Sequence, residues 1–198
     1  MSSAVPKVLV LGHSFVRRLQ SDLEGAFDAR ADRSFNLEGT ATVQLFGVGG
    51  RTVSKLRRLD LHVVRRLAPE IVILEIGTND LSDAKPETVG SSIEELVHSI
   101  LANPFVKVVG VCHVIPRGVA FEKWEEFLRR AEFLNDYISV VLQPISNAFC
   151  WTHRDFSSPY KDLYLEDGVH VNALGQYFLY RSNRGAILKS LNLLRSFK

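Results

Sequence analysis

The stretch that decides the fold is KVLVLGHSFVRRL, residues 7–19. Its first part, Lys7–Leu11, is a short apolar run typical of a buried strand, and a helix is expected from Phe15 onward. Ser14 then lies in the strand-to-helix turn, with its backbone N–H at the positive end of the helix dipole. A serine in this turn would have surroundings that favour an oxyanion.

The alternation of strand and helix continues along the chain. Apolar, β-branched runs predict strands, and longer segments with helical spacing predict the helices between them. Continuous apolar strands in such an alternation predict an α/β fold, with three layers (α/β/α) and a mostly parallel sheet of about five strands. The expected strands are Lys7–Leu11, Thr42–Phe46, Ile71–Ile76, Val106–His113 and Ala148–Trp151, and the expected helices are Phe15–Phe27, Val53–Leu67, Thr88–Leu101, Phe121–Leu142 and Ala173–Leu194.

Size and composition narrow the class of protein. A chain of 198 residues suits one sizeable core, so a single domain over residues 1–198 is expected. Hydrophobic residues make up 46% and charged residues 23%, which argues against a disordered or fibrous chain. The net charge of +2 argues against a strongly basic nucleic-acid binder. Four arginine pairs could form a patch, although solvated helix faces are the simpler interpretation: Arg17-Arg18, Arg57-Arg58, Arg65-Arg66 and Arg129-Arg130.

The cysteines and the start of the chain bear on the compartment. Cys112 and Cys150 fall in predicted strands, so buried reduced thiols are expected rather than a disulfide framework. The sequence before Lys7 lacks the pattern of a signal peptide, and no apolar run is long enough to span a bilayer. We therefore expect an intracellular domain.

The six histidines and two cysteines lack the spacing of a structural zinc site, and no P-loop or full dinucleotide motif is present. Neither a metal nor another cofactor is therefore expected.

Polar residues follow several of the predicted strands. Gly12-His13-Ser14, Gly47–Gly50 and Gly77–Asp80 follow the first three strands, and Asp167 and His170 lie in a loop after the fifth. Ligand sites of parallel α/β sheets lie outside the carboxyl ends of the strands, near the point where the strand order reverses. These four segments are therefore expected to converge on one edge of the sheet.

The residues at this edge are those of a serine-hydrolase triad. Ser14 would be the nucleophile, His170 the base and Asp167 the carboxylate that orients the imidazole. The Asp167–His170 spacing lets one turn of chain place the carboxylate against Nδ1, leaving Nε2 for the serine proton. The N–H of Ser14, an N–H from a glycine of the second loop and the Asn79 amide would form an oxyanion hole.

In order and separation, four short motifs resemble the blocks of the SGNH (GDSL-type) hydrolases over nearly the whole chain. They are Gly12-x-Ser14, the Gly-Gly-x-Thr turn of Gly49–Thr52, Gly77-x-Asn79-Asp80 and Asp167-x-x-His170. The resemblance implies a flavodoxin-like SGNH fold and hydrolysis of a carboxylic ester, with an acetyl or a lipid acyl group, through an acyl-enzyme; the substrate would be a small-molecule or lipid ester. It assigns the second oxyanion N–H to Gly50, because the family glycine directly precedes an x-Thr pair.

Two positions depart from the family pattern. His13 stands where the first block usually has Asp, and Arg51 stands where the second often has Asp. Neither position carries a covalent step in the family, so the chemistry should survive while the hydrogen bonds that hold the loops differ.

A first block of the Gly-His-Ser type also resembles the esterase domain in the first reading frame of some non-LTR retrotransposons. His13 as a local base is a rival to His170, but adjacent side chains rarely point at each other.

Each site residue also has a simpler interpretation. Ser14 could be only a helix N-cap, and Asn79 and Asp80 could only cap the turn after the third strand. His170 could be a partly buried histidine that is satisfied by backbone groups. These simpler interpretations lose support when they are taken together. Residues that only capped their own turns would have no reason to lie at the same edge of the sheet.

Residues near the other strand ends are candidates for substrate contact. His113, Arg117 and His153 follow strands, with ordinary loop polarity as the favoured interpretation. Apolar side chains precede the triad pair, and they could line an acyl pocket or lid, or pack the loop onto the core; we slightly favour the pocket. They are Phe156, Tyr160, Leu163, Tyr164 and Leu165.

A second hypothesis belongs to another class of function. The domain could be a weakly active or inactive module that binds a lipid or acylated ligand, with the arginine pairs touching membrane or nucleic acid. The altered first block and the arginine pairs motivate it. Nucleic acid is not expected as a partner of this domain alone, and the sequence leaves the oligomeric state open.

Overall fold

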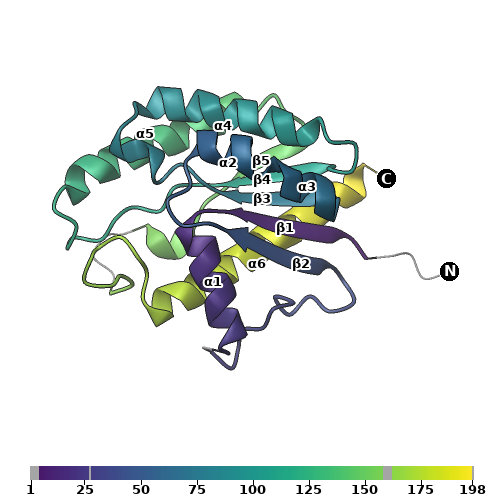
Figure 1. Ribbon diagram of the computed structural model, residues 1–198, viewed down its shortest axis with the longest axis horizontal. Helices are drawn as coiled ribbons and strands as arrows, with labels where there is room; N and C mark the ends of the chain where they lie inside the picture. The colour runs from purple at the N-terminus through teal and green to yellow at the C-terminus, as the bar shows by residue number, and fades with distance from the viewer. Residues whose placement is uncertain (1–4, 27, 158–161, 198) are drawn as a thin grey trace.

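A five-stranded parallel sheet forms the centre of the protein (Figure 1). The structure is a computed structural model that describes residues 5–26, 28–157 and 162–197. The strand order is β2-β1-β3-β4-β5, and all neighbouring strands pair in parallel, so the predicted mostly parallel sheet is confirmed as fully parallel. The strands are β1 (Lys7–Gly12), β2 (Thr42–Gly47), β3 (Ile71–Glu75), β4 (Val108–Cys112) and β5 (Ala148–Trp151).

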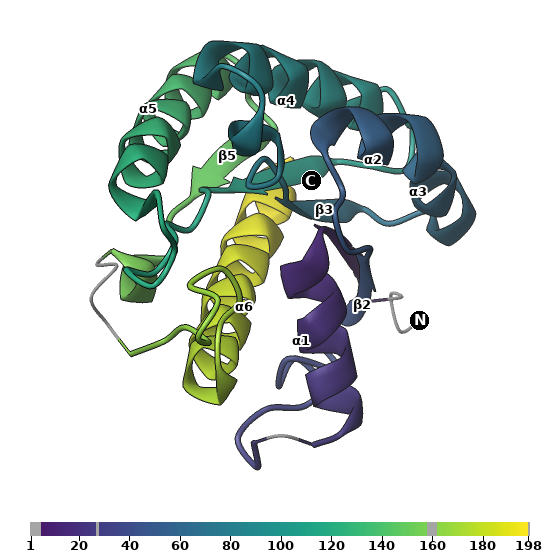
Figure 2. The ribbon, with the colours of Figure 1, turned by 60° about the vertical axis from the view of Figure 1, so that its left-hand side comes forward.

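Helices cover both faces of this sheet, as Figure 2 shows. Helices α1 and α6 lie on one face, and α2 to α5 lie on the other. The bounds are α1 (Ser14–Glu24), α2 (Val53–Leu59), α3 (Leu61–Leu67), α4 (Pro86–Leu101), α5 (Trp124–Leu142) and α6 (Ala173–Ser196), with the 3₁₀ turns η1 (Asp80–Ser82) and η2 (Arg154–Phe156). The predicted three-layer α/β/α architecture is therefore confirmed.

The central strands explain why two apolar clusters form on one sheet. In β1, Val8 and Val10 point into the cluster beneath α1 and α6, whereas Leu9 and Leu11 point into the cluster beneath the other helices. All four side chains are almost fully buried. Each contributes about 2 kcal/mol of hydrophobic free energy relative to an exposed side chain. A strand that is covered on both faces therefore needs apolar side chains at successive positions.

One predicted helix is divided in two. The apolar spacing of Val53–Leu67 predicts one continuous helix, but α2 ends at Leu59 and α3 begins at Leu61. Between them lies Asp60, whose carboxylate is buried and accepts two hydrogen bonds from the Arg51 guanidinium, at 2.6 and 2.9 Å. The break therefore coincides with a tertiary ion pair that apolar periodicity cannot reveal.

The strand order places the reversal point between β1 and β3. The connections after these strands leave in opposite directions, toward β2 on one side and β4 on the other, so a crevice opens at their carboxyl ends. The segments that carry Ser14 and Asn79 begin there. Among the described residues, no helix is long and apolar enough to cross a membrane.

Candidate active site

Ser14 is the first residue of α1, directly after β1. The N-cap is His13, whose Nδ1 accepts the backbone N–H of Phe15 at 3.3 Å. The interpretation of Ser14 as a simple N-cap is therefore wrong. Since the first N–H groups of a helix have no partner within the helix, the Ser14 N–H is available to an oxyanion.

His13 has a structural role in this turn. Its ring is buried, and burial lowers its pKa to about 4, with His170 and His153 acting in the same direction and Glu75 opposing them. The ring is therefore neutral at pH 7, which leaves Nδ1 free to accept the Phe15 N–H. A buried imidazole that is occupied as a helix cap is a poor proton acceptor for Ser14, so the rival role of His13 as local base is not supported.

The turn from β1 into α1, Gly12-His13-Ser14, is called the nucleophile turn below, and it also needs a glycine before His13. A Cβ on Gly12 would lie 2.2 Å from the backbone oxygen of Glu75 in β3. That same oxygen accepts the backbone N–H of His13 at 3.2 Å. The turn therefore rests directly against the end of β3, which fixes where α1 begins.

Asp167 and His170 form the carboxylate–imidazole pair that their spacing predicts. His170 Nδ1 lies 2.7 Å from Asp167 Oδ2, while Asp167 Oδ1 accepts the N–H groups of Val169 and His170. Burial would raise the pKa of Asp167, but these hydrogen bonds lower it to about 2. The carboxylate is therefore ionised at pH 7 and holds the imidazole with Nε2 pointing away from it.

The pair lies close to the start of α1. The His170 ring stands edge-on to the Phe15 ring, with 6.5 Å between the ring centroids, and Phe15 directly follows Ser14. His170 is also near enough to His13 to influence its pKa. Two segments about 155 residues apart in sequence thus meet at one end of the sheet.

Gly50 and Asn79 lie on two loops that are bonded to each other. Asn79 Nδ2 donates to the Arg51 backbone oxygen at 2.8 Å, and an amide carries a second hydrogen that remains for a substrate oxygen. Gly50 has φ +67°, and a Cβ there would meet nothing within 4 Å, so its backbone borders open space. Glycine is suited to this left-handed backbone conformation.

Asp80 strengthens the same connection. Its carboxylate oxygens accept the Val53 N–H at the start of α2, at 3.0 and 3.2 Å. Burial raises the pKa of Asp80 to about 6 against the opposing effect of this hydrogen bond. Because Asn79 and Asp80 both reach across to the neighbouring loop, the interpretation that they cap only their own turn is wrong.

The four candidate substrate contacts have different surroundings. His113 lies between Ser139 Oγ and Thr152 Oγ1, at 3.0 and 3.2 Å. The Tyr164 hydroxyl donates to the Pro116 backbone oxygen at 2.5 Å, and burial raises the pKa of this hydroxyl. Leu165 is 41% exposed.

Arg117 is the fourth of these candidates. Its guanidinium lies over the rings of Phe121 and Phe127, with Ser82 Oγ at 3.5 Å. Burial lowers its pKa, and the charge of Asp167 acts in the opposite direction. Arg117 therefore lies within electrostatic range of the triad loop.

The loop before the triad pair packs largely onto the core. Phe156 and Leu163 are 1% and 2% exposed and belong to the apolar cluster beneath α1 and α6. The slight preference for an acyl pocket is therefore wrong for Leu163, which is buried in the core, whereas Phe156 also borders a surface pocket. Tyr160 lies outside the described residues.

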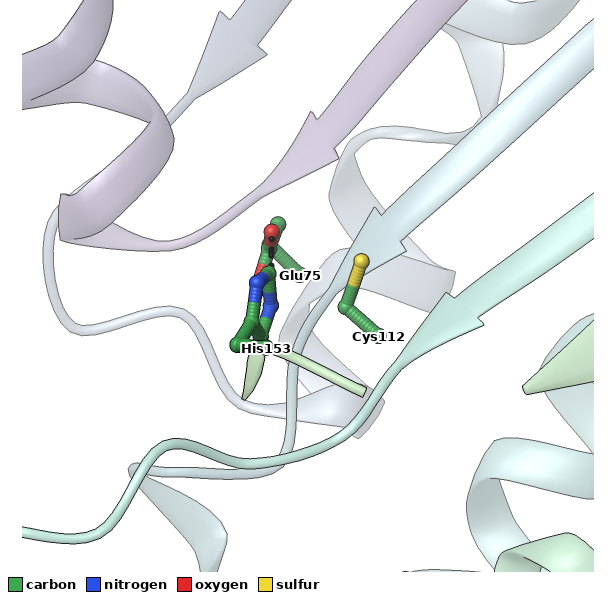
Figure 3. Close-up of side chains that lie close together, drawn as sticks. All are labelled: Glu75, Cys112 and His153. Atoms are coloured by element: carbon green, nitrogen blue, oxygen red, sulfur yellow. Dashed lines mark hydrogen bonds and ion pairs between the residues drawn. The ribbon is translucent and has the colours of Figure 1, made fainter. Parts of the chain in front are cut away.

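Sequence reasoning missed a buried polar cluster below the nucleophile turn (Figure 3). Glu75 at the end of β3 lies 3.2 Å from His153 Nε2 and accepts the Asn183 amide at 2.9 Å. Cys112, at the end of β4, also hydrogen-bonds to Glu75. Burial disfavours ionisation of Glu75, but His153, His13 and Asn183 hold its pKa below the ordinary value. His153 is thus a buried partner of Glu75, and its interpretation as ordinary loop polarity is wrong.

The other cysteine and the arginine pairs have unremarkable surroundings. Cys112 and Cys150 are free thiols, as expected, the first buried and the second half-buried. The arginine pairs are distributed over α1 on one face of the sheet and α2, α3 and α5 on the other (Figure 2). Arg57 and Arg130 bond to Glu95 and Glu126. The four pairs do not form one patch, which favours solvated helix faces.

The comparisons with known proteins agree with the fold and with ester hydrolysis as the class of reaction. Residues 10–177 match the GDSL-like Lipase/Acylhydrolase family, so the chain belongs to this family of ester hydrolases. The predicted SGNH (GDSL-type) resemblance is confirmed at the level of the family.

Individual relatives are more distant. The chain is 26% identical over 155 residues to the platelet-activating factor acetylhydrolase IB subunit alpha1 of Rattus norvegicus; this covers 74% of the chain and 63% of the relative. The chain thus spans less than two thirds of the length of this curated protein. Among solved structures, acetylxylan esterase Axe2 from Geobacillus stearothermophilus has a TM-score of 0.67 at 17% identity and covers 96% of both chains. A GDSL-like lipase from Bacteroides thetaiotaomicron has a TM-score of 0.68 at 16% identity, covering 93% of this chain and 89% of the other. These structures support the fold.

Proposed function

We propose that the protein is a serine esterase that cleaves a carboxylic ester through an acyl-enzyme, with Ser14, His170 and Asp167 as its triad. The observation that carries the proposal is the Asp167–His170 pair, at 2.7 Å, beside the first turn of the helix that begins with Ser14. Membership of an ester-hydrolase family supports the same reaction class.

In the first half-reaction, Ser14 Oγ attacks the ester carbonyl carbon while His170 Nε2 takes the hydroxyl proton. Asp167 stabilises the imidazolium that forms, because its carboxylate is already hydrogen-bonded to Nδ1. The carbonyl oxygen becomes an oxyanion that accepts the N–H groups of Ser14 and Gly50 and the second amide hydrogen of Asn79. The tetrahedral intermediate then expels the alcohol, which takes the proton from His170.

Water completes the cycle. His170 Nε2 accepts a proton from water as the water oxygen attacks the acyl carbon, and the same donors hold the second oxyanion. Collapse releases the carboxylic acid, and the proton returns to Ser14 Oγ. The bond from Asn79 to the Arg51 oxygen fixes one donor before substrate arrives, so little reorganisation is needed when charge develops.

Short acyl groups are the proposed substrates. The relatives include proteins named as an acetylxylan esterase and a platelet-activating factor acetylhydrolase subunit. Leu163 and Tyr164 pack inward, against the core and Pro116 respectively, which limits the room that this loop leaves for a long acyl chain. We therefore propose an acetyl or similarly small acyl group.

The altered first block is the main motive for an inactive binding module. His13 supplies the cap of α1 that holds Ser14 in place, so the loss of the usual Asp leaves the turn intact. This observation favours the esterase over the binding module. The finer resemblance to a retrotransposon esterase domain rests on Gly12-His13-Ser14 and stays a prediction.

The direct test is hydrolysis of p-nitrophenyl acetate by the wild-type protein and the Ser14→Ala variant. Removal of the nucleophile should lower kcat by about 10⁴-fold or more, because the rest of the triad cannot act without it. A matched control is Ser54→Ala, which removes an exposed hydroxyl in the first turn of α2. Undiminished turnover in Ser14→Ala would refute the proposed nucleophile.

A further inference from the structure

The cluster of Glu75, Cys112 and His153 carries an inference that does not depend on the esterase. These side chains come from the ends of β3 and β4 and from the residues after β5, and they lie close together (Figure 3). One ligand-type atom from each lies within 4.8 Å of the other two, and all three residues are buried. We propose that they form a site for a zinc ion.

The atomic separations suit that ion. Zn–N and Zn–O bonds of about 2.0–2.1 Å in a tetrahedral arrangement place the nitrogen and oxygen about 3.3 Å apart. His153 Nε2 and Glu75 Oε2 are 3.3 Å apart. A Zn–S bond of about 2.3 Å requires the Cys112 sulfur about 3.6 Å from the other two atoms. Because 4.8 Å bounds the separations within the cluster, each distance from the sulfur exceeds the required value by about 1.2 Å at most.

Outer partners already orient the imidazole and the carboxylate. His153 Nδ1 lies 2.8 Å from Ser182 Oγ, which also accepts the Trp151 indole N–H at 2.9 Å. Asn183 Nδ2 donates to Glu75 Oε1 at 2.9 Å, which leaves Oε2 for the ion. Such second contacts fix the tautomer and the ring direction of metal-binding histidines and hold metal-binding carboxylates in place.

Charge and ligand type favour zinc. Thiolate and imidazole are preferred ligands of zinc, and carboxylate completes many of its sites. An ionised carboxylate and a thiolate would balance the two positive charges of the ion. On binding, the Cys112 S–H proton leaves to solvent and the imidazole proton moves from Nε2 to Nδ1, where Ser182 Oγ accepts it, so that three bonds to zinc replace the hydrogen bonds among these groups.

A surface pocket borders one of the three ligands. His153 lines a surface pocket of about 140 Å³, which His113, Thr152 and Phe156 also border. A site with three protein ligands takes water as its fourth ligand. Asn183 holds Glu75 through its Nδ2 group, and its Oδ1 atom is buried without a hydrogen-bond partner among the described residues. This oxygen could accept a hydrogen bond from such a water.

The test is metal binding by the reduced full chain after treatment with a chelator. Zn²⁺ is titrated against a chromophoric competitor, and Co²⁺ reports a thiolate ligand by its near-ultraviolet charge-transfer absorption. We expect one Zn²⁺ per chain and a thiolate–cobalt band. Ser182→Ala should weaken Zn²⁺ binding about 10- to 100-fold, as removal of an outer partner typically does.

Two matched pairs of variants locate the site. Cys112→Ser should abolish the cobalt band and one-to-one Zn²⁺ binding, whereas Cys150→Ser should keep both, because Cys150 packs on the opposite face of the sheet. His153→Gln should lose binding and His113→Gln should keep it. Near-ultraviolet circular dichroism checks the fold of each metal-free variant. If His153→Gln does not fold, the comparison of Cys112→Ser with Cys150→Ser is sufficient to locate the site. Absence of one-to-one binding by the folded wild type, or equal binding by Cys112→Ser and Cys150→Ser, would overturn the proposal.

Discussion

Two carboxylate–imidazole pairs lie at the same end of the sheet, and they differ in nearly every physical respect. Asp167 and His170 are three residues apart, with side chains 47% and 25% exposed. Glu75 and His153 are 78 residues apart in sequence, with side chains 4% and 2% exposed. The first pair borders solvent and can exchange protons with a substrate, whereas the second is enclosed by α6 and the strand ends.

The comparison shows that a carboxylate and an imidazole can have different roles in two different surroundings. The carboxylate of Asp167 is fixed by two neighbouring backbone N–H groups, so the pair is complete within one short loop. The carboxylate of Glu75 depends on Asn183 in α6, so this pair forms only when the helix packs on the sheet. We expect changes in the first pair to alter turnover and changes in the second to alter stability.

The largest expected effect is on turnover in the exposed pair. His170→Ala should lower kcat for p-nitrophenyl acetate by about 10⁴-fold, because no other group would take the Ser14 proton. His98→Ala, which removes an exposed histidine at the end of α4, is the control and should leave turnover unchanged. Equal turnover in His170→Ala and the control would contradict the assignment of the base.

The next effect concerns the oxyanion. Asn79→Ala should lower kcat by about 10²–10³-fold with little change in KM, because the oxyanion exists only as the reaction proceeds. Steady-state kinetics separate the two parameters. Asn103→Ala, in the loop between α4 and β4 at the other end of the sheet, serves as the control. A change confined to KM would instead make Asn79 a group that binds the ground-state substrate.

The buried pair should reveal itself in stability. Glu75→Gln should lower the free energy of unfolding by about 3 kcal/mol, because it leaves His153 without its buried carboxylate. Asp167→Asn removes a carboxylate from the exposed pair and should cost less than about 1 kcal/mol. Denaturant unfolding at pH 7 measures both values. Similar losses in the two variants would remove the distinction between the pairs.

The smallest effect is a pH dependence that arises beside the buried pair. The pKa of His13 is lowered from 6.5 to about 4 in the folded protein, so its contribution to stability is present above pH 6.5 and is lost as the pH falls toward 4. His13→Asn keeps an N-cap acceptor without this titration. Between pH 6.5 and pH 5, the wild type should lose about 1–2 kcal/mol more than His13→Asn. Parallel stability curves for the two proteins would contradict the assignment.

The sequence was informative where the physical signal is local. Lys7–Leu11 and Ala148–Trp151 predict strands because apolar runs reflect burial on both faces, and both runs lie within observed strands. Asp167 and His170 are close in sequence, so their hydrogen bond follows from one turn of chain. The site at the reversal of strand order followed from the α/β pattern together with motif positions.

Features that depend on distant contacts escaped prediction. The break at Asp60 accompanies a bond from Arg51, nine residues earlier, and apolar spacing carries no trace of it. Glu75 reads as part of a strand, Cys112 as a buried thiol and His153 as a loop residue. Their meeting follows only once β3, β4 and β5 are neighbours and α6 covers them.

We propose that the Ser14 hydroxyl, on the first turn of α1, is activated by the His170 imidazole after β5. Reaction with a fluorophosphonate probe, followed by mass spectrometry of the labelled peptide, tests it most directly, because such probes react with an activated serine. We expect stoichiometric labelling of Ser14 in the wild type and its loss in both Ser14→Ala and His170→Ala. Folded wild-type protein that resists the probe, or labelling of Ser14 that persists in His170→Ala, would contradict it.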